Sequence, residues 1–309
     1  IRKSLVGSEM CIRDRILMAN SAQFDGGTIL HHVTNWRDDV WIPLNMFGVD
    51  LSITKHVLML WIVASITIAL TLYATRAYRK NINAKPKGIA HLYEILLEFV
   101  KTDIVLPNIG SKGYRTWTPL IATFFIFILI SNYIGLIPFF EKIQTILPVY
   151  DGTSNKFAPV SGSSTITGNF TVTAALSVIT FFSIIIAGTM KHGFIGHWKN
   201  MIPGGVPAPV LIILIPIEIA GMFIKPLALI LRLGANMTAG HIGMVAIFGI
   251  PMIIYQSGAS IGVGISVGVV SVILNTAIYF LEFIVCLVQA YVFSLLSAVF
   301  IGMAIHAEH

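Results

Sequence analysis

The chain has 309 residues, of which 56% are hydrophobic and 11% are charged, and its formal net charge is +6. Several apolar runs reach about 20 residues, the length that crosses a bilayer core, which excludes an ordinary soluble domain. The basic residues lie just beyond the ends of these runs and form no stripe with interleaved aromatics, so they predict membrane orientation and no nucleic-acid partner. We therefore expect an all-α polytopic membrane protein with about five membrane-embedded helices, two of them long and tilted.

The beginning of the chain is polar and divides into two segments. Residues 1–17 lack the apolar core of a signal peptide and mix acidic with basic residues, so we interpret them as an extension or non-native segment before a start at Met18. We expect residues 18–50 to form an outer-side N-terminal segment. Residues 51–309 are predicted to form a single membrane-embedded helical domain.

The first predicted span runs from about Ile53 to Tyr78, and a basic cluster follows it at once. Because basic residues concentrate on the inner side of a membrane protein, this end is expected to face inward and the N-terminus outward. The cluster consists of Arg76, Arg79, Lys80, Lys85 and Lys87.

Residues 88–106, GIAHLYEILLEFVKTDIVL, alternate charged and apolar side chains at spacings of three and four. Glu94, Glu98 and Lys101 fall on one side, and Leu92 and Ile95 fall on the other. This pattern predicts an amphipathic helix at the inner membrane interface. We expect it to end at Pro107, because proline lacks the amide donor that continues a helix.

Two further spans are predicted at about Thr118 to Phe139 and about Phe170 to Met190. The turn-rich segment between them, residues 141–168, is expected outside. The basic segment KHGFIGHWKNMIPGG, residues 191–205, is expected inside, which agrees with the orientation of the first span.

The last two apolar segments are too long for one upright crossing. The segment from about Val210 to Tyr255 would measure roughly 69 Å as a helix, against an apolar core of about 30 Å. The segment from about Gly258 to Met303 is of similar length, so the pair predicts a hairpin of two long tilted helices. Small residues at spacings of four in the second segment predict close helix packing. They are Gly258, Gly262, Gly264 and Gly268.

Each long segment carries one series of polar residues. Glu218, Lys225 and Arg232 recur every seven residues, Asn236 follows four after the arginine, and His241 lies nine beyond it. A spacing of seven keeps residues on nearly one helix face, and we expect all five to share it. The second series, at the same spacing, consists of Asn275, Glu282 and Gln289.

Charged groups inside a membrane usually pair, line a water-filled cavity or mark an ion path. If the two helices pack antiparallel with Arg232 level with Gln289, then His241 and Glu282 lie at nearly one depth, about 13.5 and 10.5 Å from that level. An imidazole facing a carboxylate can exchange protons near neutral pH. Arginine stays protonated, so it can separate two aqueous half-paths without relaying protons.

Three other functions fit parts of this pattern. Arg232 could form a structural ion pair with Glu282, whereas Glu218 lies about 21 Å away along its own helix. A stand-alone cation/proton antiporter could use the same charges, but antiporters typically show two repeated halves with broken helices. A passive assembly anchor would explain the amphipathic helix and leave the polar series unexplained.

The sequence contains no phosphate-binding loop and no nucleophile elbow, and its two cysteines are Cys11 and Cys286. We expect no cofactor, no bound metal and no nucleotide hydrolysis by this chain itself.

Three segments of the chain carry a family resemblance. They are LRLGANMTAGH with Arg232 and Asn236, PIEIAGMFIKPLAL with Glu218 and Lys225, and LEFIVCLVQAYVFSLL with Glu282 and Gln289. They resemble subunit a of the F-type ATP synthase, in the membrane FO sector. The resemblance implies a proton-translocating subunit in which Arg232 faces a ring of c subunits. It also implies that Glu218 belongs to an inner half-channel and that His241 and Glu282 line an outer one.

The resemblance further implies partners and a location. The partners would be the c-subunit ring, the peripheral stalk subunit b, other subunits of the membrane and catalytic sectors, membrane lipid and protons. We assign Lys225, Asn236, Asn275 and Gln289 to the proton path as well. The location would be an energy-transducing membrane, either the bacterial inner membrane or the mitochondrial inner membrane.

Overall fold

The computed structural model describes residues 40–42, 45–46, 49–50, 53–80, 85, 87–136, 165–199, 208–258 and 260–306. The predicted extension at residues 1–17 and most of the predicted outer loop lie outside these ranges. Residues 40–54 contribute two short antiparallel strand pairs. They are β1 (Val40–Ile42) with β4 (Ile53–Thr54), and β2 (Asn45–Met46) with β3 (Val49–Asp50).

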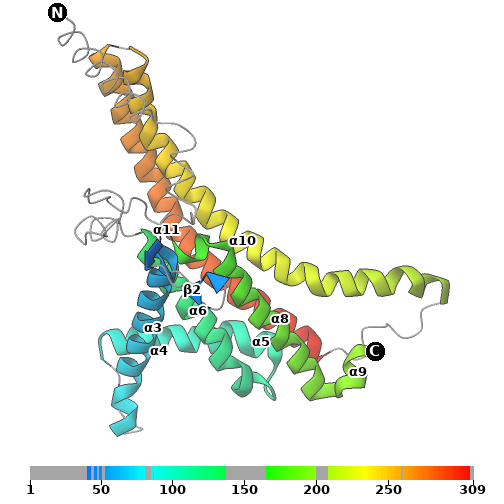
Figure 1. Cartoon of the computed structure of the whole chain (residues 1–309). Coiled ribbons are helices and arrows are strands. Elements are labelled where there is room, and N and C mark those ends of the chain that lie inside the picture. The colour runs from blue at the N-terminus through cyan, green and yellow to red at the C-terminus, as the bar shows by residue number, and fades with distance from the viewer. Residues whose placement is uncertain are drawn as a thin grey trace, which may run out of the picture.

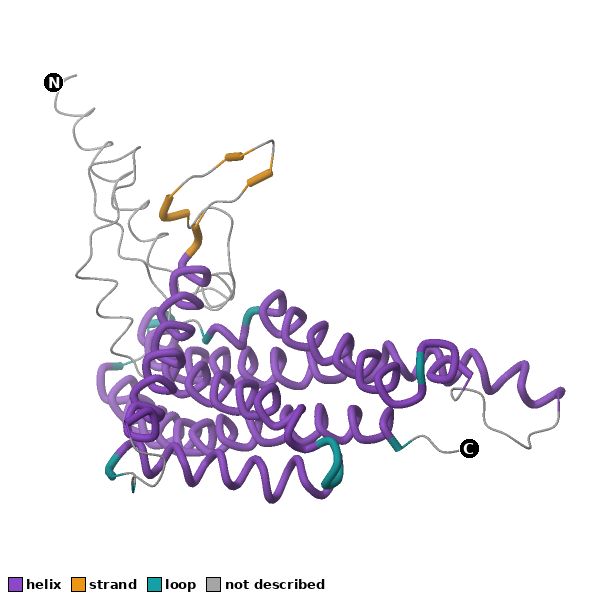
Figure 2. The backbone as a smooth tube through the Cα atoms, turned by 90° about the horizontal axis from the view of Figure 1, so that it is seen from below, coloured by secondary structure: helices purple, strands orange, loops and turns teal. Residues whose placement is uncertain are grey.

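Helices make up almost all of the remaining described chain (Figures 1 and 2). In chain order they are α3 (Lys55–Lys80), α4 (Ile89–Phe99), the π-helix η1 (Val100–Val105), α5 (Leu106–Ile109), α6 (Tyr114–Leu136), the 3-10 turn η2 (Ile166–Gly168), α8 (Phe170–His192), α9 (Phe194–Lys199), α10 (Ala208–Gln256) and α11 (Ile261–Ile305).

Five of the described helices are long and apolar enough to cross a membrane, which confirms the predicted all-α polytopic class. The candidate spans are His56–Arg76, Tyr114–Leu136, Phe170–His192, Val210–Pro251 and Ile261–Ile305. Each predicted span corresponds to one of them within a few residues, because an apolar run of bilayer length is the strongest helix signal in a sequence.

The amphipathic helix forms as α4, but its predicted end at Pro107 is wrong. The helical path continues through η1 and α5 to Ile109, and it stops at Gly110, whose φ of 82° is left-handed. Pro107 is tolerated because it stands in the first turn of α5, where an amide donor is not needed. Tyr78 on α3 donates a hydrogen bond of 2.8 Å to Glu94 Oε1 on α4, and this carboxylate acceptor raises the pKa of the Tyr78 phenol.

The core of the bundle lies where α6, α8 and α10 pack against the second half of α11. Phe124 of α6 meets Phe293 of α11 edge to face, with ring centroids 5.5 Å apart. Short polar side chains bridge other helix pairs, as where Ser177 of α8 donates to the Pro226 carbonyl of α10 at 2.7 Å. Such bonds satisfy hydroxyls that would otherwise be unpaired in an apolar environment.

Helices α10 and α11 form the predicted hairpin, and Figure 1 shows that its tip extends beyond the other helices. Helix α10 carries Pro216, Pro226 and Pro251 in its interior. Interior prolines remove hydrogen bonds and bend a helix, which suits a segment too long to stand upright.

The predicted close packing at the tip glycines is wrong. A Cβ atom built on Gly258, Gly262, Gly264 or Gly268 would meet nothing within 4 Å in the described part of the chain. The glycines of the hairpin at which a built Cβ would overlap another helix are Gly240 and Gly302. A Cβ on Gly302 would overlap the backbone carbonyl oxygen of Asn108 in α5, so α11 and α5 touch through their main chains.

We expect Gly302→Ala to lower the thermal midpoint of the purified protein in detergent, although alanine favours a helix over glycine by about 1 kcal/mol. The added methyl must displace a main chain, and overpacking of this kind costs about 1–3 kcal/mol. Gly262→Ala on the same helix is the matched control, and its midpoint should stay unchanged or rise. A stable Gly302→Ala protein would contradict the close contact.

Candidate functional site

One contact sets the register between the two arms of the hairpin. A Cβ built on Gly240 of α10 would overlap the carboxyl group of Glu282 on α11, so that carboxyl lies directly against the Gly240 main chain. Counting eight residues back along α10 and eight forward along α11 brings Arg232 level with Ala290. This register differs by one residue from the one assumed from the sequence, in which Arg232 is level with Gln289.

The predicted polar series of α10 does not occupy one face. The buried face of α10 is formed at spacings of four by Leu229, Leu233, Met237 and His241, and His241 is only 6% exposed. Arg232 is exposed. Nine residues turn a helix by about 900°, which is half a turn beyond two full ones, so His241 must lie opposite Arg232. The expectation that both share a face is therefore wrong.

Asn236 and Glu218 belong to the exposed side of α10 with Arg232, while Lys225 is half-buried. The Lys225 Nζ atom lies 5.7 Å from the ring centroid of Phe300 on α11, which is a cation–π distance. Neither Glu218 nor Arg232 forms an ion pair in the part of the chain that the structure describes.

The polar series of α11 does face the interior. Glu282 and Gln289 are 3% and 6% exposed, and Ser271 is buried four residues before the half-buried Asn275. Seven residues are two turns less about 20°, which explains why the series stays on one face along this helix.

Three buried polar atoms between the arms lack a hydrogen-bond partner within the described residues. They are His241 Nε2, Glu282 Oε1 and Asn275 Oδ1. Buried polar atoms in native proteins almost always have a partner, which can be ordered water. The three atoms therefore mark a place suited to water and to proton exchange between an imidazole and a carboxyl group.

Arg232 is surrounded by exposed apolar residues, including Leu227 and Leu231. Glu282 is buried between the arms, so a structural ion pair between Arg232 and Glu282 does not form. A guanidinium facing lipid near the middle of a bilayer is costly, by about 3 kcal/mol on insertion scales. We therefore expect this face of α10 to meet water or a polar or acidic group inside the membrane.

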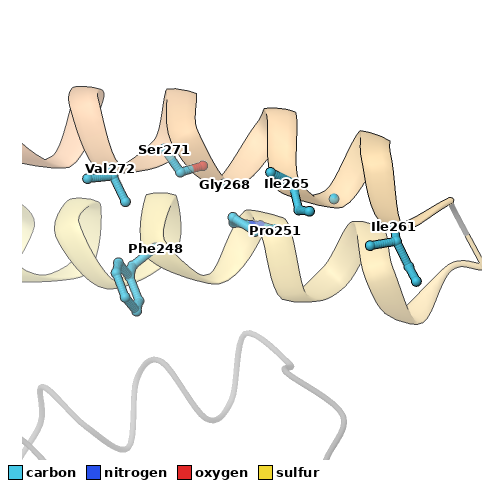
Figure 3. Close-up of a pocket in the computed structure, with 8 residues that line it drawn as sticks. Phe248, Pro251, Ile261, Ile265, Gly268, Ser271 and Val272 are labelled. Atoms are coloured by element: carbon cyan, nitrogen blue, oxygen red, sulfur yellow. The ribbon is translucent and has the colours of Figure 1, made fainter.

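A groove of about 480 Å³ lies between the arms toward the hairpin tip. Its lining includes Phe248 and Pro251 of α10, and Figure 3 shows Ile265 and Val272 of α11 pointing toward α10, with Ser271 away from the tip. The groove thus reaches Ser271, which lies about one turn before Asn275, the first member of the polar series of α11.

Three polar residues near this site were missed by the sequence-based predictions. Asn132 of α6 donates to the Cys286 carbonyl at 3.1 Å, and Thr167 donates to Asn132 Oδ1 at 2.6 Å. Tyr279 of α11 donates to the Leu136 carbonyl at 3.1 Å. An asparagine inside an apolar span is itself a signal, and it could have identified Asn132.

The fold and these residues define a polytopic membrane protein that carries an exposed arginine on one side of a helical hairpin and buried titratable groups between its arms. A family model described as the ATP synthase A chain matches residues 57–302. The chain belongs to this family, subunit a of the F-type ATP synthase.

Several bacterial proteins are similar over most of this chain. "ATP synthase subunit a 2" of Chlorobium luteolum is 38% identical over 291 residues, covering 90% of this chain and 75% of its own length. "ATP synthase subunit a" of Chloroherpeton thalassium is 36% identical over 290 residues, which are 91% and 77% of the two chains. The protein of the same name from Anaeromyxobacter dehalogenans is 32% identical over 302 residues, which are 90% and 70%.

We expect Gly240→Ala to destabilise the hairpin by about 1 kcal/mol, the lower end of overpacking costs, because its methyl group must displace the Glu282 carboxyl, which is the end of a flexible side chain. Gly243→Ala is the matched control, since a Cβ there meets nothing within 4 Å in the described chain. Thermal unfolding in detergent measures both. Adding Glu282→Ala to Gly240→Ala should recover part of the loss by removing the clashing group, whereas strictly additive losses would contradict the contact.

Proposed function

We propose that this chain is the proton-translocating stator subunit of an F-type ATP synthase, and that Arg232 faces a ring of c subunits and separates two aqueous half-paths. The single observation that supports this most directly is the exposed, unpaired Arg232 guanidinium within the described part of a membrane-spanning helix. Family membership supports the same function.

A carboxylate carried by the partner is the simplest group that satisfies Arg232. Burial in lipid raises the pKa of a carboxyl group, and a nearby guanidinium lowers it again. A ring carboxyl would therefore travel through lipid protonated and release its proton when it reaches Arg232. Since arginine keeps its own proton, it blocks a continuous proton wire between the two sides.

The outer half-path is proposed to run between the arms of the hairpin. It would pass Ser271 and Asn275 and reach Glu282 and His241, whose unpartnered atoms support hydration. Gln289 lies farther along the same buried face of α11, near the level of Arg232.

The inner half-path is proposed to run along the exposed side of α10. Glu218 lies 14 residues before Arg232, or about 21 Å along a helix. It can take up protons released near Arg232 and pass them to the inner side. Asn236, one turn after Arg232 on the exposed side, and Lys225 complete the polar groups assigned to the path.

The remaining proposals follow from the family. The other partners are the peripheral stalk subunit b and further subunits of the membrane and catalytic sectors. The location is the bacterial plasma membrane, which agrees with five apolar helices and with the bacterial relatives. The ion carried is the proton, and the chain itself hydrolyses no nucleotide.

We expect Arg232→Ala and Arg232→Lys to reduce ATP synthesis and ATP-driven proton pumping in inverted membrane vesicles to background. Alanine removes the charge, and a buried lysine can lose its proton and lacks the planar fork of arginine. Arg76→Lys, at the exposed end of α3, is the matched control and should retain wild-type pumping.

Normal pumping by Arg232→Ala vesicles would refute the assigned role. Ion uptake into liposomes by the purified chain alone, without any ring partner, would instead favour the antiporter.

A further inference from the structure

A second polar cavity lies far along the bundle from the hairpin site. It has a volume of about 480 Å³ and lies where the α5–α6 turn meets the C-terminal ends of α8 and α11. We call it the basic-end pocket, and its polar lining consists of Ser111, Lys112, Thr116, Trp117, Lys191 and His306.

The pocket carries positive charge without a compensating acid. Lys112 and Lys191 approach it from different elements, and both are exposed. No aspartate or glutamate belongs to its lining, and neither lysine forms an ion pair within the described residues. Two ammonium groups that share one cavity repel each other unless an anion lies between them.

The main chain adds free donors to the same place. The backbone amides of residues 111–113 donate no hydrogen bond to described atoms, and they precede the first turn of the 23-residue helix α6. Amides at the beginning of a long helix attract anions, because they combine with the positive end of the helix dipole.

His306 contributes one ring nitrogen. Its Nδ1 lies 2.9 Å from the Gly302 carbonyl oxygen, which can only accept, so Nδ1 donates its proton there. Nε2 points at Gly110, because a Cβ built on Gly110 would lie 3.4 Å from it. The nitrogen that faces the pocket therefore accepts when the ring is neutral and donates when the ring is protonated.

An apolar surface extends from the pocket along the membrane-facing side of α8. Met190 lines the pocket, and Ile186 and Phe182 follow at intervals of four, all three strongly exposed. These residues cover about 12 Å of helix, close to the roughly 15 Å depth of one hydrocarbon leaflet. A ligand with both an anionic head and acyl chains fits this surface better than a free anion does.

We propose that the basic-end pocket binds the phosphate headgroup of an anionic phospholipid, and that one acyl chain lies along Phe182, Ile186 and Met190. Basic pockets between transmembrane helices on the inner side are suited to such headgroups. Lys112 and Lys191 neutralise the phosphate, and the amides of residues 111–113 donate to its oxygens.

The test is lipid retention by the intact, purified complex. Delipidated complex is incubated with equal amounts of phosphatidylglycerol and phosphatidylcholine, and native mass spectrometry counts the lipid that stays bound to this subunit. We expect wild type to retain phosphatidylglycerol preferentially. Lys112→Gln/Lys191→Gln should weaken this retention about 25-fold, since each lysine contributes roughly fivefold.

Three controls separate the possible results. Lys85→Gln/Lys87→Gln alters exposed lysines outside the pocket and should bind like wild type. Lys112→Arg/Lys191→Arg keeps both charges and should retain the lipid, which excludes misfolding as the cause. Met190→Ser should weaken retention of phosphatidylglycerol without affecting binding of inorganic phosphate.

Equal retention of both lipids, or unchanged retention by Lys112→Gln/Lys191→Gln, would overturn the proposal. Displacement of the lipid by millimolar inorganic phosphate would assign the pocket to a free anion instead. Retention by the isolated chain but not by the complex would show that a protein partner fills the pocket, and it would also overturn the proposal.

Discussion

The contact between the Glu282 carboxyl and the main chain at Gly240 is the constraint on which the site depends. It is possible only because glycine lacks a side chain there, and it brings the two arms into one register. With the register set, His241, Asn275 and Gln289 lie along the seam, and Arg232 lies outside it. A shift by one residue would turn each polar group of α11 by about 100° away from the seam.

The hairpin therefore keeps the buried polar groups between its arms apart from the exposed Arg232 on the other side of α10. His241 and Glu282, which can gain and lose protons, are enclosed between the arms, where burial makes each unpaired atom costly and favours water. The permanent charge of Arg232 lies on the exposed side of α10, where it can pair with a neighbouring group or face water inside the membrane.

The opposite end of the bundle combines main-chain contacts with uncompensated charge. Gly302 lets α11 touch α5 directly, and the turn after α5 presents Lys112 and free amides beside Lys191 of α8. Lys191, which belongs to a basic segment that predicts membrane orientation, thus also lines a cavity with Lys112. Their clustering follows from the positive-inside rule, whereas their convergence on one cavity follows from helix packing.

The sequence by itself determined the class, the five spans, the hairpin and the residue types of the site, because bilayer length and intramembrane charge are local signals. Helix geometry already places His241 opposite Arg232, because nine residues turn a helix by about 900°, and the tertiary structure decided that the His241 face is buried and the Arg232 face exposed. The tertiary structure also decided which glycines allow close packing, namely Gly240 and Gly302 and not the glycines at the tip. The reason is that the space beside a glycine is occupied only where another helix packs against it, and the spacing of residues along one helix does not reveal this.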